Sequence, residues 1–141
     1  MTGIFMETKI FVDTSAFVAL FDKKDKYHQR ATDYFMSLQF GAVQLHTSNY
    51  IIDETITRIR IKNGHKFALE FGKYFFMSKI FQIHYIDKEI EQDAFEIFKK
   101  YSDKKLSFTD STSFALMKKV NIKKAFTFDT DFKKAGFEIS N

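Results

Sequence analysis

Short apolar runs alternate along this chain with longer segments in which apolar residues recur every three or four positions. The runs predict strands over residues 9–13, 43–46, 79–86, 124–128 and 137–140. The longer segments predict helices over residues 14–21, 27–38, 50–62, 65–77, 87–101 and 109–120. Strands separated by helices are typical of a parallel sheet with both faces covered. We therefore expect an α/β fold, a three-layer α/β/α sandwich with a central parallel sheet.

Acidic residues stand where the predicted strands give way to helices. Asp13 and Asp129 each follow an apolar run, while Asp110 and Glu54 lie near the starts of two helices. Since the carboxyl ends of parallel strands meet at one edge of a sheet, acids far apart in sequence are expected to converge there. Converging carboxylates repel one another unless a cation lies between them, and Mg²⁺ or Mn²⁺ accepts such oxygen ligands in an octahedral shell. The pattern therefore predicts a metal site.

Each of these acids also has a purely structural interpretation. Asp13 suits a helix N-cap, a role worth about 1 kcal/mol. Asp110 follows Ser107 by three residues, which is the spacing of a capping box. Glu54 would meet the positive end of its helix dipole, and Arg58 one turn further on would form a surface ion pair with it.

The remaining acids, Asp129 and Asp131, are good turn formers, because Asp accepts hydrogen bonds from nearby backbone amides. None of these interpretations explains why four acids should gather at one edge of one sheet. Taken together, the acids favour a functional site.

Four motifs carry a resemblance to a known family. Residues 10–20, 53–54, 108–116 and 126–132, which hold IFVDTSAFVAL, DE, FTDSTSFAL and FTFDTDF, resemble the PIN domain, and particularly its VapC-like branch. Each motif is short, but their order and spacing along nearly the whole chain make the combination specific. The resemblance implies a metal-dependent endoribonuclease, with Mg²⁺ or Mn²⁺ as cofactor and RNA as substrate. It also implies a homodimer.

The resemblance assigns the catalytic and metal-binding acids to Asp13, Glu54, Asp110 and Asp129. It further implies that the hydroxyls of Ser15 and Thr127 orient ligands or waters, and that Asp131 acts as an outer acid. Hydrolysis by water without use of the ribose 2′-OH is expected to leave 5′-phosphate and 3′-hydroxyl ends. The RNA target and the number of metal ions stay open, and so does the existence of an antitoxin partner.

Length, composition and charge limit the number of domains, the kinds of chemistry and the partners that this chain can have. A length of 141 residues with 45% hydrophobic and 28% charged residues fits a single PIN-like domain over residues 1–141. The absence of Cys excludes disulfides, a thiolate zinc site and thiol catalysis, and favours a reducing cytoplasm.

No stretch approaches the roughly 20 apolar residues of a membrane helix, so we expect no membrane partner. The net charge of +4 is compatible with RNA but carries little weight. The 19 Phe residues are expected to pack the core rather than to stack on bases.

The remaining expectations concern partners and rival functions. Arg58 is a candidate RNA contact, whereas the lysine pairs are more typical of solvated surface. The four His residues show no spacing that suggests a zinc site or an acid–base pair. The segment 65–77 carries more large apolar residues than one buried stripe needs, which favours a dimer contact near Phe75 and Phe76. The main rival is a non-catalytic PIN-like module that binds RNA or acts as a scaffold.

Overall fold

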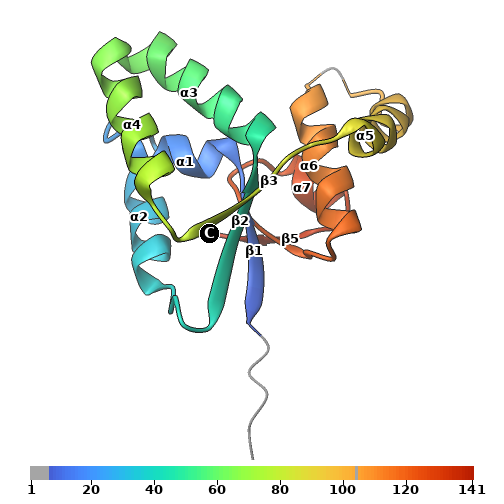
Figure 1. Cartoon of the computed structure of the whole chain (residues 1–141), viewed down its shortest axis with the longest axis horizontal. Coiled ribbons are helices and arrows are strands. Elements are labelled where there is room, and N and C mark those ends of the chain that lie inside the picture. The colour runs from blue at the N-terminus through green and yellow to red at the C-terminus, as the bar shows by residue number, and fades with distance from the viewer. Residues whose placement is uncertain (1–6, 104) are drawn as a thin grey trace, which may run out of the picture.

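The computed structural model describes residues 7–103 and 105–141, and its centre is a parallel sheet (Figure 1). Within these residues five strands pair in the order β3-β2-β1-β4-β5. Every neighbouring pair is parallel. The strands are β1 (Thr8–Val12), β2 (Val43–Ser48), β3 (Phe81–His84), β4 (Lys124–Phe126) and β5 (Glu138–Ser140).

Helices cover both faces of the sheet, which confirms the predicted three-layer sandwich. Figure 1 shows α1 to α4 on one side of the sheet and α5 to α7 on the other. Their bounds are α1 (Thr14–Phe21), α2 (His28–Ser37), α3 (Asn49–Asn63), α4 (His65–Met77), α5 (Lys88–Lys100), α6 (Phe108–Lys119) and α7 (Asp131–Lys134). Among the described helices, none is long and apolar enough to cross a membrane.

Two strands are shorter than the sequence predicts, and one helix was not predicted. β3 stops at His84 because it pairs with β2 only opposite Leu45 to Ser48, and beyond it the Ile86 amide binds the Asn49 side chain at 2.8 Å. β4 ends at Phe126, which is its last residue paired with β1 and with β5. The short helix α7 then follows, and its four residues are too few to show a helical period.

Phenylalanine side chains fill the core, as expected from the sequence. Phe17 of α1 lies at the centre of one half of the core, with ring centroids 5.7 Å from Phe71 and 5.8 Å from Phe75, both on α4. On the opposite face of the sheet, Phe114 of α6 packs edge-on against Phe132 of α7 at 5.0 Å. This packing fixes α1, α6 and α7 against the sheet, and these three helices begin at or next to the candidate acids.

Candidate active site

The ends of β1 and β4 bring the two halves of the candidate site together. Val12 pairs with Phe126 across the two strands, and the Asp13 amide donates to the Phe126 carbonyl at 3.1 Å. The chain leaves β1 toward α1 on one face of the sheet, whereas β4 is reached from α6 on the other face. This is the point at which the strand order reverses, where parallel sheets place ligands.

Two hydroxyls hold the Asp13 carboxylate in place. Asp13 Oδ2 accepts hydrogen bonds from Ser15 Oγ at 2.9 Å and from Thr127 Oγ1 at 2.9 Å. Each hydroxyl in turn accepts from a backbone amide, Ser15 from Phe128 at 3.0 Å and Thr127 from Asp129 at 3.0 Å. Asp13 also caps α1 through the more distant Ser15 amide at 3.4 Å. All of these bonds reach Oδ2, so Oδ1 is available to a further partner.

Asp110 sits in the capping box that the sequence suggested. Ser107 Oγ accepts from the Asp110 amide at 3.0 Å, and the Ser107 amide donates to Asp110 Oδ2 at 3.2 Å. The capping interpretation is therefore correct for this residue. It does not compete with metal binding, because the box engages one carboxylate oxygen and fixes the direction of the other.

Asp129 and Asp131 complete a compact group of acids. The Asp131 amide donates to Asp129 Oδ1 at 2.9 Å, which confirms the turn-forming role of Asp129. One oxygen atom each from Asp110, Asp129 and Asp131 lie within 4.8 Å of one another. The three carboxylates come from the start of α6 and from the residues that follow β4 and begin α7.

Burial and mutual repulsion disfavour the charged forms of these acids. Burial raises the pKa of Asp13 to about 6, even though the hydroxyls of Thr127 and Ser15 act in the opposite direction. Burial, followed by the negative charge of Asp13, raises the pKa of Asp110 to about 7. The pKa of Asp129 is also raised, mainly by burial. Carboxylates whose pKa values are raised in this way form a site where a bound cation would favour their charged forms.

Glu54 stands apart from this group. It is half-buried on α3, beyond the first helical turn, so the helix dipole interpretation does not hold for it. Within residues 7–103 and 105–141 it forms no hydrogen bond or ion pair, and the predicted pair with Arg58 does not form. Glu54 is also not part of the group formed by Asp110, Asp129 and Asp131.

Arg58 instead lines a cavity of about 410 Å³ that opens beside the acids. Ser15 and Asp129 also line this cavity, together with Tyr27 and Phe128. The rings of Tyr27 and Phe128 stack with their centroids 4.5 Å apart and their planes 5° from parallel. No periodic pattern in the sequence indicates this aromatic pair, because its two members lie in loops that meet only in the folded chain.

Two histidines form a pair that no spacing in the sequence indicated. His46 Nδ1 lies 2.8 Å from His84 Nε2, and His46 Nε2 lies 3.1 Å from Gln44 Oε1. The two histidines belong to the neighbouring strands β2 and β3, so only the strand register brings them together. Burial, followed by the charge of His84, lowers the pKa of His46 to about 4.

Comparison with known proteins points in the same direction as this geometry. A family model described as PIN domain matches residues 10–138. The 23S rRNA-specific endonuclease VapC20 of Mycobacterium tuberculosis is 34% identical over 128 residues, which cover 91% of this chain and 95% of that protein. A VapC ribonuclease of Archaeoglobus fulgidus is 29% identical over 123 residues, covering 86% of this chain and 77% of that protein.

Solved structures confirm the fold. The crystal structure of M. tuberculosis VapC20, described as a Sarcin-Ricin loop cleaving toxin, superposes with a TM-score of 0.83 at 33% identity and covers 91% of this chain and 95% of that one. The FitAcB structure from Neisseria gonorrhoeae has a TM-score of 0.69 at 19% identity, covering 94% and 96% of the two chains, and shares the fold alone.

Proposed function

We propose that this chain hydrolyses RNA at a divalent metal site formed by Asp13, Asp110 and Asp129. The chain belongs to the PIN domain family and is an endoribonuclease of the VapC type. The observation that carries the proposal is the convergence of buried acids at the carboxyl ends of β1 and β4. The rival interpretation, a non-catalytic module, loses its support because the chain is an endoribonuclease of this type.

The acids present fit a hard divalent cation. Asp110, Asp129 and Asp131 offer one oxygen each within 4.8 Å, and carboxylate oxygens are the ligands that Mg²⁺ and Mn²⁺ prefer. The raised pKa values of Asp13 and Asp110 supply a second argument, because a cation removes the repulsion that produces part of the shift. Asp131, which the resemblance implied as an outer acid, is as near to Asp110 and Asp129 as a direct ligand would be.

A bound divalent ion would neutralise the anionic oxygens of a phosphodiester and lower the pKa of a coordinated water. The residues of this chain position that chemistry. Ser15 and Thr127 hold Asp13 in a single orientation, and the capping box does the same for Asp110. Glu54 would join through its own side chain or through water, or would serve a second ion. We expect products with 5′-phosphate and 3′-hydroxyl ends, since the described site presents no histidine to form a cyclic phosphate.

RNA would reach the acids through the cavity that contains Arg58. The Arg58 guanidinium would contact a phosphate, and the stacked rings of Tyr27 and Phe128 form an apolar wall beside Asp129. The M. tuberculosis relative is described as specific for 23S rRNA, so ribosomal RNA is the first substrate to test.

We also propose protein partners. Phe76, Met77 and Tyr85 are 66%, 80% and 72% exposed, which is unusual for large apolar side chains. We infer a homodimer that covers part of this surface. Because the similar M. tuberculosis protein is described as a toxin, we also propose an antitoxin protein as a partner.

The central test is cleavage of ribosomal RNA by the purified protein. Cleavage should require Mg²⁺ or Mn²⁺, stop with EDTA and fall at least 100-fold in Asp110→Asn. Asp93→Asn is a matched control, because Asp93 is exposed on α5 and is not one of the acids grouped at the site. Cleavage that persists in EDTA and is equal in Asp110→Asn would contradict the mechanism.

A further inference from the structure

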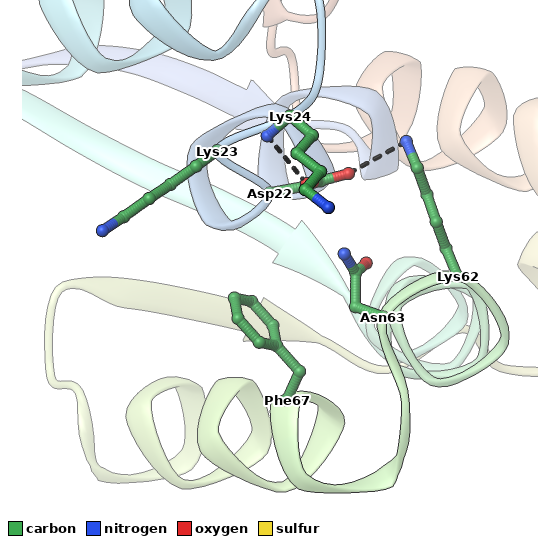
Figure 2. A pocket seen from close by; sticks show the side chains of 6 residues that line it. All are labelled: Asp22, Lys23, Lys24, Lys62, Asn63 and Phe67. Carbon is green, nitrogen blue, oxygen red and sulfur yellow. Dashed lines mark hydrogen bonds and ion pairs between the residues drawn. The ribbon is translucent and has the colours of Figure 1, made fainter.

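A second cavity, of about 500 Å³, lies outside the acidic site beside the loop that joins α1 to α2. It is lined by Asp22, Lys23, Lys24, Lys62, Asn63 and Phe67. Figure 2 shows these side chains coming from three segments: the loop after α1, the end of α3 and the first turn of α4. Three ammonium groups against one carboxylate give this cavity a net positive charge.

The single carboxylate of the cavity is already neutralised. Asp22 is only 2% exposed, its Oδ1 accepts from the Lys24 amide at 2.9 Å, and its Oδ2 lies 2.9 Å from Lys62 Nζ. In Figure 2 both contacts appear as dashed lines. Lys23 and Lys24 form no ion pair with any described residue, so their ammonium groups are available to an anionic ligand.

One polar atom of the cavity lacks a partner. Asn63 Oδ1 is buried and receives no hydrogen bond from the described part of the chain. A buried acceptor without a donor costs roughly 1–3 kcal/mol. Figure 2 shows the Asn63 amide and the Phe67 ring facing the same space below Asp22. A ligand that carries N–H or O–H groups next to an apolar face would satisfy both residues.

The second cavity adjoins the one beside the acids. The loop of residues 22–27 contributes Lys23 and Lys24 to one cavity and Asp25, Lys26 and Tyr27 to the other. Two side-chain-to-backbone bonds keep this loop ordered, from the Lys24 amide to Asp22 at 2.9 Å and from the Tyr27 amide to Asp25 at 2.8 Å. On α3, Arg58 of one cavity lies one turn from Lys62 of the other.

We propose that this second cavity binds a nucleotide of the RNA strand that is cleaved at the acidic site, so that the substrate runs along α3 from Asp129 past Arg58 to Lys24. Lys23 and Lys24 contact phosphates, the Phe67 ring packs on a base, and Asn63 Oδ1 accepts from a base amino group or a ribose hydroxyl. The inference rests on the proposed ribonuclease function and adds an anchor distant from the cleaved bond.

A length series of single-stranded RNA tests the proposal. Binding of fluorescein-labelled oligonucleotides is measured by anisotropy in the Asp110→Asn background, where no cleavage interferes. For the otherwise unchanged protein, affinity should step up once the strand is long enough to reach from the acids to the second cavity. In Lys23→Ala/Lys24→Ala the step should disappear, and the slope of log K against log salt should fall by about 1.4 for two lost contacts to a single strand.

Lys99→Ala/Lys100→Ala is the matched control, because it removes the same charge from the end of α5 in the opposite layer. It should leave the step in place. Equal weakening by both double variants would overturn the proposal and indicate a general charge effect, and an unchanged step in Lys23→Ala/Lys24→Ala would overturn it as well. Asn63→Ala and Phe67→Ala should lower the step without changing the salt slope.

These measurements distinguish a failure of the second cavity as an RNA-binding site from a failure of the proposed ribonuclease function. If the unaltered protein cleaves RNA but shows no step, the second cavity fails alone. If the step is present but metal-dependent cleavage is absent, the ribonuclease mechanism fails while the RNA-binding surface stands.

Discussion

Asp13 and Asp110 belong to a group of buried carboxylates whose negative charges cost stability in the absence of a counter-ion. We predict that millimolar Mn²⁺ raises the thermal midpoint of the protein, because a ligand that binds only the native state adds about 2.7 kcal/mol at 100 times its Kd. In Asp13→Asn the rise should shrink, while the midpoint in EDTA should hold or increase as burial of charge is relieved. Differential scanning calorimetry, with Asp93→Asn as control, measures both. A loss of metal-free stability with an intact Mn²⁺ response would leave Asp13 with a capping role only.

The lowered pKa of His46 predicts that the stability of the protein depends on pH. The pKa of His46 is lowered to about 4 in the folded protein from the ordinary 6.5, so the unfolded chain takes up a proton first as pH falls. The stability that neutral His46 contributes is complete above pH 6.5 and is lost as pH falls toward 4, by roughly 1–3 kcal/mol. Urea unfolding at pH 4.5 and 7.5 should show a smaller difference in His46→Gln than in the unaltered protein. His65→Gln, at an exposed position, should behave like the unaltered protein.

Single residues show where sequence reasoning succeeds and where it stops. The capping roles of Asp13 and Asp110 were predictable because they depend on neighbours within three residues. The contact between Thr127 and Asp13 was not predicted, because 114 positions separate the two residues. The family resemblance implied only that the Thr127 hydroxyl orients ligands or waters. The His46–His84 pair depends on the register of two strands, and no local pattern encodes that register.

At the level of elements, the ion pair between Asp22 and Lys62 ties the end of α1 to the end of α3. Lys62 and the Lys24 amide lower the pKa of Asp22, so this carboxylate stabilises the fold above the ordinary carboxyl pKa and loses its effect as pH falls below it. We predict that Lys62→Met lowers the thermal midpoint at pH 7, because it leaves Asp22 buried without its cation. Lys66→Met, at an exposed position on α4, is the control. Equal midpoints for the two variants at pH 7 would contradict the prediction.

Helices were more predictable than strands in this chain. The helical periods placed α1 and α4 at their observed bounds, since amphipathic spacing persists over several turns. β3 and β4 were predicted too long, because an apolar run continues past the last residue that has a pairing partner. The length of a strand is set by its neighbours in the sheet as much as by its own sequence.

For the whole molecule, the structure corrects the position of the expected dimer contact. Phe75 is 1% exposed and belongs to the core, whereas Phe76 is 66% exposed beside a cavity of about 280 Å³ lined by Ile52, Ile83 and Tyr85 among others. Phe75→Glu would therefore unfold the protein and test nothing. We predict a dimer by light scattering at micromolar concentration, and its dissociation in folded Phe76→Glu. Phe95→Glu, at another exposed Phe on α5, should remain a dimer. A mass near 16.6 kDa for the unaltered protein would reject the dimer.

The central strand β1 lies between β2 and β4, and its pairing with β4 has a consequence for synthesis on the ribosome. Asp13 leaves the exit tunnel early, but Thr127, Asp129 and Asp131 are translated more than 110 residues later. Parallel pairing over such a separation forms late, because the loop must close before any contact is gained. We therefore expect a nascent chain that still lacks residues 124–131 to hold only part of the proposed site and to be catalytically silent. The proposed activity would then begin only after β4 and the acids that follow it have been synthesised and paired with β1.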